Sequence, residues 1–220
     1  MIVGAFIVPH PPLIIPQVGR GGEKKVSKTI AAYEAVADEI AALHPDTVII
    51  SSPHTVMYGD YFHISPRKGA QGSFAQFGAP DVSFDMLYDT ELVSEITHIC
   101  GDNSIPAGTF GERDASLDHG TMVPLYFITQ KCSDFRIVRI GLSGLPLTDH
   151  YRLGQCIKEA ADRTDKRIVY VASGDLSHKL KRTGPYGFAP EGPQYDEKLM
   201  DVCSRGAFGE LLEFDESFCE

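Results

Sequence analysis

Residues 2–8 read IVGAFIV, and the chain then breaks at residues 9–12, which read PHPP. A continuous apolar run rich in β-branched residues is typical of a strand that is covered on both faces of a sheet. Residues 22–43 carry apolar side chains every three or four positions, which indicates an amphipathic helix. Residues 47–51 (TVIIS) predict a second buried strand. Strand, helix and strand in this order are typical of two parallel strands in an α/β protein.

The rest of the chain continues this alternation with a less regular middle. Apolar runs and breaker residues predict strands over 61–65, 136–142 and 167–172, helices over 90–100, 123–129, 148–163, 196–205 and 208–218, and loops over 66–82, 103–118 and 182–193. Asp89 and Thr148 are expected to cap their helices, and Gly101 to end one. We therefore predict an α/β fold over residues 1–220, a single domain with a central, mostly parallel sheet flanked by helices.

Composition excludes several classes of function. Lys and Arg number 20 against 30 Asp and Glu, so the net charge is −10, which disfavours nucleic acid and anionic membrane surfaces as partners. No apolar run approaches the roughly 20 residues of a membrane span, and the apolar start lacks the basic region of a signal peptide. The five cysteines form no CxxC pair, which favours a reduced, cytoplasmic protein.

Three histidines follow three of the predicted strands. His10 and His54 come directly after the first two, and His178 follows the strand at 167–172 within the run SGDLSH. Ligands of open α/β sheets bind beyond the carboxyl ends of the strands, and imidazole suits iron, zinc, copper and nickel. The sequence therefore predicts a metal site with an acid/base histidine at this edge. The alternative is that each is a hydrogen-bonded loop residue.

A fourth histidine has two interpretations. His119 lies in the run DHGT, where it could contact substrate or donate a proton, or where Asp118 or Thr121 could simply cap a helix. The other histidines, at 44, 63, 98 and 150, fall on predicted strands, helices or helix ends, so surface or core packing is expected for them. Ser173, Asp175 and His178 are too crowded for a hydrolase triad, and no nucleotide-binding glycine motif occurs.

Four runs in order carry a family resemblance: residues 4–12 (GAFIVPHPP), 51–54 (SSPH), 117–125 (LDHGTMVPL) and 173–178 (SGDLSH). Together they resemble the class III extradiol ring-cleavage dioxygenases, in their catalytic B-subunit superfamily. The chain is most similar to the branch of the AmmeMemoRadiSam system, which includes the Memo proteins. The resemblance extends over essentially the whole chain.

The resemblance implies a site and a reaction. It makes His10 and His54 the two histidine ligands of a non-haem Fe(II), with zinc or copper as the alternative metals. It makes His178 the acid/base histidine and His119 a second active-site histidine. The implied partners are a small catecholic substrate and O₂, with cleavage of the ring next to its hydroxyls. It also implies self-association into a homo-oligomer.

Two departures from the family keep alternatives open. The family's third ligand is a Glu near a final apolar strand, whereas this sequence ends at Glu220 without such a strand. That segment is expected beyond residue 220 or is absent, and Asp215, Glu216 and Glu220 are the substitutes. In the Memo branch a Cys replaces the carboxylate, which implies a metal-binding redox or partner-binding protein without ring cleavage. A metal-free domain with structural histidines is the third alternative.

Overall fold

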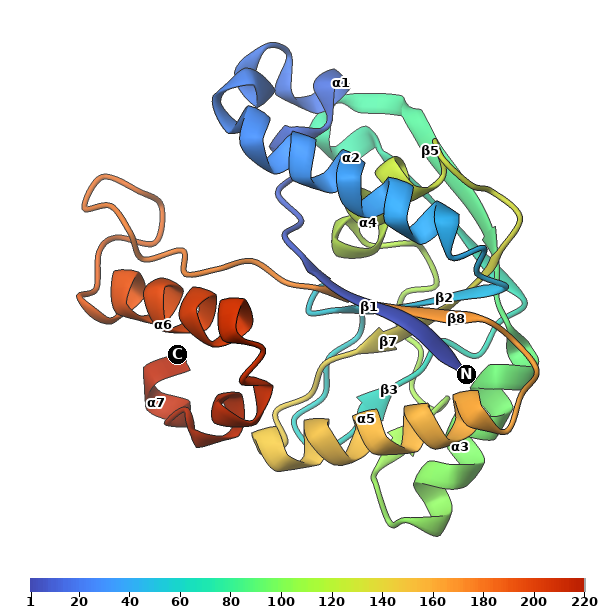
Figure 1. Cartoon of the computed structure of the whole chain (residues 1–220). Helices are drawn as coiled ribbons and strands as arrows, with labels where there is room; N and C mark the ends of the chain where they lie inside the picture. Colours follow the sequence, from blue (N-terminus) through green and yellow to red (C-terminus); the bar gives the residue numbers. More distant parts are fainter. Residues whose placement is uncertain (220) are drawn as a thin grey trace. The chain divides into compact units, whose positions relative to one another are not determined.

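The computed structural model describes residues 1–219 and divides the chain into two compact units, Met1–Gly174 and the part from Asp175 onward (Figure 1). Each unit is described by itself. The prediction of one domain over residues 1–220 stays a prediction. No helix in the described part of the chain combines the length and the apolar character needed to span a membrane.

The first unit is built on a parallel sheet of four strands. The strands are β1 (Ile2–Val8), β2 (Thr47–Ser52), β7 (Arg136–Gly141) and β8 (Ile168–Ser173), in the spatial order β1-β8-β2-β7. β8 pairs with β1 on one side and with β2 on the other. All four were predicted from the sequence, and the central parallel sheet is confirmed. One expectation is wrong: β1 is not covered on both faces, because it lies at the sheet edge with Ile7 58% exposed.

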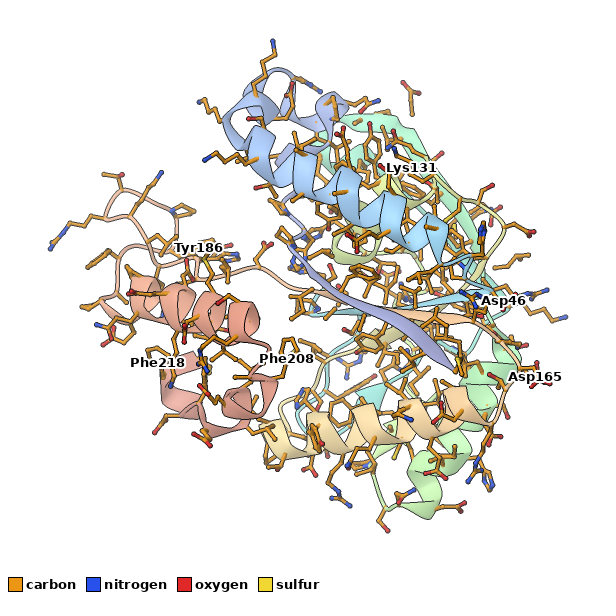
Figure 2. All side chains as sticks on the ribbon, viewed as in Figure 1. Asp46, Lys131, Asp165, Tyr186, Phe208 and Phe218 are labelled. Carbon is orange, nitrogen blue, oxygen red and sulfur yellow. The ribbon has the colours of Figure 1, made fainter. Side chains whose placement is uncertain are left out.

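Helices cover both faces of this sheet (Figure 1). The helices are α2 (Ser27–Ala42) and α4 (His119–Ile128) on one face, and α3 (Thr90–Asp102) and α5 (Leu147–Asp162) on the other. Successive residues of a strand point to opposite faces. Val48 and Ile50 of β2 therefore join the core under α2 and α4, whereas Ile49 joins the core under α3 and α5. Side chains fill both layers (Figure 2).

An antiparallel hairpin replaces the loop expected at 66–82. β4 (Gly69–Phe74) pairs with β5 (Ala79–Leu87) through a short 3-10 turn at Ala75–Phe77. Ala70, Phe74 and Met86 are buried in the core under α4. The alternate side chains point away from that core, as period-two patterning requires. The abundance of Gly, Gln and Ala in this segment hid the alternation, so the loop prediction was wrong.

The remaining boundaries show smaller differences. The short elements of the first unit are α1 (Pro16–Gly19), β3 (Phe62–His63), β6 (Ala107–Gly108) and 3-10 turns at Pro12–Ile14 and Gly22–Val26. Asp89 caps α3 as predicted, accepting from the backbone N–H of Leu92 at 3.1 Å. That helix continues past Gly101. Pro146, not Thr148, lies at the N-cap of α5, where no side chain bonds the first turn.

The second unit is helical. It contains α6 (Glu191–Arg205), a 3-10 segment at Phe208–Glu213 and α7 (Glu216–Cys219), so α6 begins five residues before the predicted start at 196 and one predicted helix is two shorter pieces. The rings of Tyr195, Phe214 and Phe218 pack together with centroids 5.8–6.1 Å apart.

Candidate metal centre

His10 is held in one orientation at the end of β1. Its side chain is 2% exposed, and its Nδ1 lies 3.0 Å from the Oγ of Ser173. Ser173 donates its only hydroxyl hydrogen to the carbonyl of Gly120 at 2.6 Å, so its oxygen must accept from the Nδ1–H of His10. Tyr33 fixes the preceding turn by donating to the carbonyl of Pro9 at 2.5 Å. The network therefore assigns the lone pair of neutral His10 to Nε2, the nitrogen left to bind a metal.

His54 approaches that nitrogen from the end of β2. Its Nε2 lies 3.0 Å from the Nε2 of His10. The turn is fixed by its backbone N–H, which donates to the Oγ of Ser52 at 3.1 Å. His54 is exposed where His10 is buried, so the pair has one side toward the interior and one toward solvent.

His119 joins the pair from the first residue of α4. Its ring centroid lies 3.9 Å from that of His54 and 5.6 Å from that of His10. Asp118 caps the helix, accepting from the backbone N–H of Thr121 at 3.0 Å and from the Oγ of Ser52 at 2.6 Å. The cap expected at Asp118 is confirmed, and it places His119 beside the other histidines. The role of His119 toward a substrate stays a prediction.

Gly120 permits this close approach. A Cβ at this position would lie 2.3 Å from the Oγ of Ser52 and 3.3 Å from the Cδ2 of His54. Any larger residue would therefore push α4 away from the end of β2. Gly120 and Ser173 both shape the site, and no sequence pattern predicted a role for either. Their positions, next to His119 and at a strand end, were the available signals.

The three histidines can share one ion. The ligand atoms of His10, His54 and His119 all lie within 4.8 Å of one another. Two imidazole nitrogens about 2.1 Å from one ion are about 3 Å apart at a right angle, which matches the separation of the two Nε2 atoms. Imidazole donors suit iron, zinc and copper. The donor set therefore fits a transition metal, whose identity the geometry leaves open.

Among the side chains that the structure describes, no carboxylate or thiol joins this group. Of the three substitutes for a third ligand, Asp215 lies in the second unit, the side chain of Glu216 is outside the described ones, and Glu220 is outside the described residues. His178 also belongs to the second unit, where its Nε2 lies 3.3 Å from the Oδ2 of Asp175 and its ring 4.9 Å from that of Tyr186. The roles of His178 and of the third ligand stay predictions.

A buried guanidinium holds the segment that leads into α4. Arg139 of β7 is 1% exposed, and its nitrogens reach five groups: the Oγ of Ser65 at 2.8 Å, the carbonyl of Ser116, the carbonyl of Asp114 at 3.2 Å, Glu112 at 3.7 Å and Asp118 at 4.0 Å. A planar fork of five N–H donors suits such convergent acceptors. Arg139 thus ties residues 112–118 to the sheet, a role that the sequence did not indicate.

His63 fixes the start of the same segment. It is fully buried in β3, and its Nδ1–H donates to the carbonyl of Phe110 at 3.0 Å. Its Nε2 has no hydrogen-bond partner among the described residues. Burial lowers the pKa of His63, so its ring is held neutral. The packing role expected for this histidine is consistent with its burial.

A cleft of about 1100 Å³ opens beside His54 and His119. It lies wholly within the first unit, between the outer face of the β4–β5 hairpin and residues 114–119. Its polar lining residues are Gln71, Ser73, Gln76, Ser83, Asp85, Asp114, Ser116 and Asp118. Sequence reasoning missed this wall because it missed the hairpin, although the alternation of residues 82–86 (VSFDM) was a usable signal.

Comparison with known proteins identifies a family and several relatives of this chain. Residues 4–219 match the family described as the catalytic LigB subunit of aromatic ring-opening dioxygenase. Protein CA_C1420 of Clostridium acetobutylicum is 38% identical over 211 residues, which are 92% of this chain and 45% of that protein. The chain therefore spans less than half the length of this curated relative.

Two further relatives show the range of the family. The 2-aminophenol 1,6-dioxygenase beta subunit of a Pseudomonas species is 25% identical, with 100% of this chain and 79% of that protein aligned. A MEMO1 family protein of Thermococcus onnurineus is 28% identical, with 80% of this chain and 60% of that protein aligned. The resemblance seen in the sequence is confirmed: the chain belongs to the family of the catalytic LigB subunit of aromatic ring-opening dioxygenases.

Proposed function

We propose that this chain is the metal-binding part of an extradiol-type dioxygenase that cleaves the ring of a small catecholic substrate with O₂. The observation that carries the proposal is the group of three histidines, with ligand atoms within 4.8 Å of one another, at the end of a cleft of about 1100 Å³. A cleft of this size holds a small aromatic molecule with room for a substituent. The free thiols support a reducing, cytoplasmic setting.

His10 and His54 would hold Fe(II), which when bound supplies a template for both catechol oxygens and for O₂ and a path for electrons between them. Ser173 accepts from the Nδ1–H of His10, which leaves the lone pair of the neutral His10 ring on Nε2, the atom that lies 3.0 Å from the Nε2 of His54. His119 borders the cleft at the helix N-terminus, where its ring can contact an oxygen of the bound substrate. His178 is proposed to take a proton from the catechol and to return it later.

The test is anaerobic titration of metal-free protein with Fe(II), with zinc and copper in parallel. The native chain is expected to bind one Fe(II), and His10→Ala and His54→Ala to lose that binding while keeping the fold. His98→Ala is the matched control, because His98 is exposed on α3, where its Nε2 lies 3.6 Å from the Oδ2 of Asp102. Failure of the native chain to bind any of the three metals in stoichiometric amount would contradict the proposal.

A catechol panel in air then tests turnover. His178→Gln is expected to keep the metal and to lower turnover by roughly 10²–10⁴-fold, the usual contribution of a general acid/base. Loss of the metal in this variant would instead make His178 a ligand.

The second candidate is a MEMO-like metal protein that acts through redox chemistry or partner binding without ring cleavage. Two observations favour it: the MEMO1 family relative, and the lack of a carboxylate beside the histidines among the described side chains. Stoichiometric metal binding without oxygen uptake on any catechol would support this candidate over the first.

A further inference from the structure

The wall of the cleft is polar because of how side chains alternate along the β4–β5 hairpin. Gln71 pairs with Asp85 across the β4–β5 hairpin, and Ser73 pairs with Ser83. Their strand neighbours Phe74 and Met86 face the core, so these four side chains share the opposite face, which lines the cleft. A substituent that enters the cleft therefore meets amide, hydroxyl and carboxylate groups along this wall.

Charge in the cleft has one sign. Its lining residues include Asp85, Asp114 and Asp118 and no Lys or Arg. Asp118 is occupied by the helix cap and lies 4.0 Å from the guanidinium of Arg139. Two carboxylates remain, on the hairpin and on the segment that leads into α4.

These two carboxylates are bonded only to neutral donors. Asp85 accepts from the Nε2 of Gln71 at 2.8 Å, and Asp114 accepts from the backbone N–H of Ser116 at 2.9 Å. The Ser116 hydrogen bonds hold the pKa of Asp114 below its usual range, so it stays ionised. Within residues 1–219, neither carboxylate has a cationic nitrogen within 4.0 Å. The lining of the cleft thus carries negative charge, with no Lys or Arg among its residues.

We infer that the substrate of this site is a catechol whose ring substituent ends in a protonated amine, and that Asp85 and Asp114 select for it. The inference rests on the proposed function and names its substrate class. A cation in the cleft gains attraction from both carboxylates, an anion is repelled, and an apolar group removes water from them without replacing it. The Oε1 of Gln71 and the Oγ of Ser73 would accept the remaining hydrogen bonds of the ammonium group.

The test measures binding to the metal-loaded protein under anaerobic conditions by calorimetry. The probes are matched in size: 4-(2-aminoethyl)catechol, 4-ethylcatechol and 3,4-dihydroxyphenylacetate. The amine is expected to bind about tenfold more tightly than the carboxylate at low ionic strength, because each partly exposed pair is worth up to about fivefold and attraction replaces repulsion. This ratio should shrink as salt is added.

Variants assign the preference to the two residues. Asp85→Asn and Asp114→Asn are each expected to lower the amine-to-carboxylate ratio about 2–5-fold, because each removes one exposed charge. Asp134→Asn is the matched control, since Asp134 is an exposed carboxylate outside the cleft lining. Equal or tighter binding of the carboxylate, or a ratio unchanged in both cleft variants, overturns the inference.

A second pair of probes separates this inference from the proposed function. 2-Phenylethylamine and phenylacetate lack the hydroxyls that would bind a metal, so their binding to metal-free protein reports on the cleft alone. If no catechol binds to metal-loaded protein but 2-phenylethylamine still binds more tightly than phenylacetate, the proposed function fails and the charge selectivity stands. If phenylacetate binds as tightly, or neither probe binds, the charge selectivity fails.

Discussion

The two sides of the site are built in different ways. His10 and His54 follow strands that are paired along their length to β8, so the backbone hydrogen bonds of the parallel sheet set their positions. The cleft side consists of a surface hairpin and residues 110–118, which a few polar side chains tie to the sheet. The histidine side is therefore expected to tolerate little change, and the cleft side to be the place where specificity varies.

The largest expected effect comes from removing Arg139, the side chain that ties residues 112–118 of the cleft side to the sheet. Arg139→Met removes a buried guanidinium that bonds Ser65 and two backbone carbonyls and faces two carboxylates, and it should cost about 3–5 kcal/mol of unfolding free energy. Urea denaturation measures the change as a lower midpoint at an unchanged slope. Arg136→Met on the same strand is the control, because Arg136 is exposed and makes one long bond, to the carbonyl of Tyr88 at 3.4 Å. Equal urea midpoints for the two variants would contradict a stabilising role for Arg139.

The histidine side can be weakened without touching a proposed ligand. Ser173→Ala removes the acceptor that sets the tautomer of His10, and metal affinity should fall about 10–100-fold, as for other partners of ligating histidines. Competition with a chelator measures the affinity. Ser143→Ala, at a buried serine outside the histidine group, should leave it unchanged. An unaltered affinity in Ser173→Ala would show that the hydroxyl does not orient the ligand.

A third comparison concerns how closely the hairpin lies on α4. A Cβ on Gly72 would lie 2.7 Å from both the Cβ of Leu117 and the Sδ of Met122. Gly72→Ala should therefore cost about 1–2 kcal/mol through overpacking. Gly101→Ala in α3 meets open space and should instead stabilise by about 0.5–1 kcal/mol. Thermal unfolding of the two variants should shift in opposite directions, and a shift in the same direction would contradict the predicted contact.

The smallest expected effect is a change in how the unfolding free energy depends on pH. Burial lowers the pKa of His63, so the unfolded chain binds a proton at this residue at a higher pH than the folded chain does. The neutral His63 ring contributes fully to the unfolding free energy above about pH 6.5, and this contribution is lost as the pH falls below that value. The slope of the unfolding free energy from this residue is at most about 1.4 kcal/mol per pH unit. His63→Asn keeps a donor to the carbonyl of Phe110 and should make the unfolding free energy less steep between pH 7 and 5. An unchanged slope would show that His63 titrates alike in both states.

The sequence predicted the parts of the fold that depend on local, continuous patterns. Four strands, the helix cap at Asp89 and the positions of His10 and His54 follow from apolar runs that end abruptly. The wall of the cleft could not be predicted in this way, because the hairpin alternates small residues such as Gly72 and Ala70 with polar ones. The burial of these small residues depends on a helix that is distant in the sequence. Arg139 could not be assigned either, since its partners come from other segments of the chain.

The order of the strands has a consequence for when the site can form. The two strands that carry His10 and His54 do not pair with each other, because β8 lies between them. β8 enters last of the four and also supplies Ser173, the partner of His10. During synthesis, both histidines thus emerge more than a hundred residues before the strand that sets their spacing. A nascent chain that has not reached residue 173 holds the metal-binding groups but not the metal-binding geometry, so loading must follow closure of the sheet.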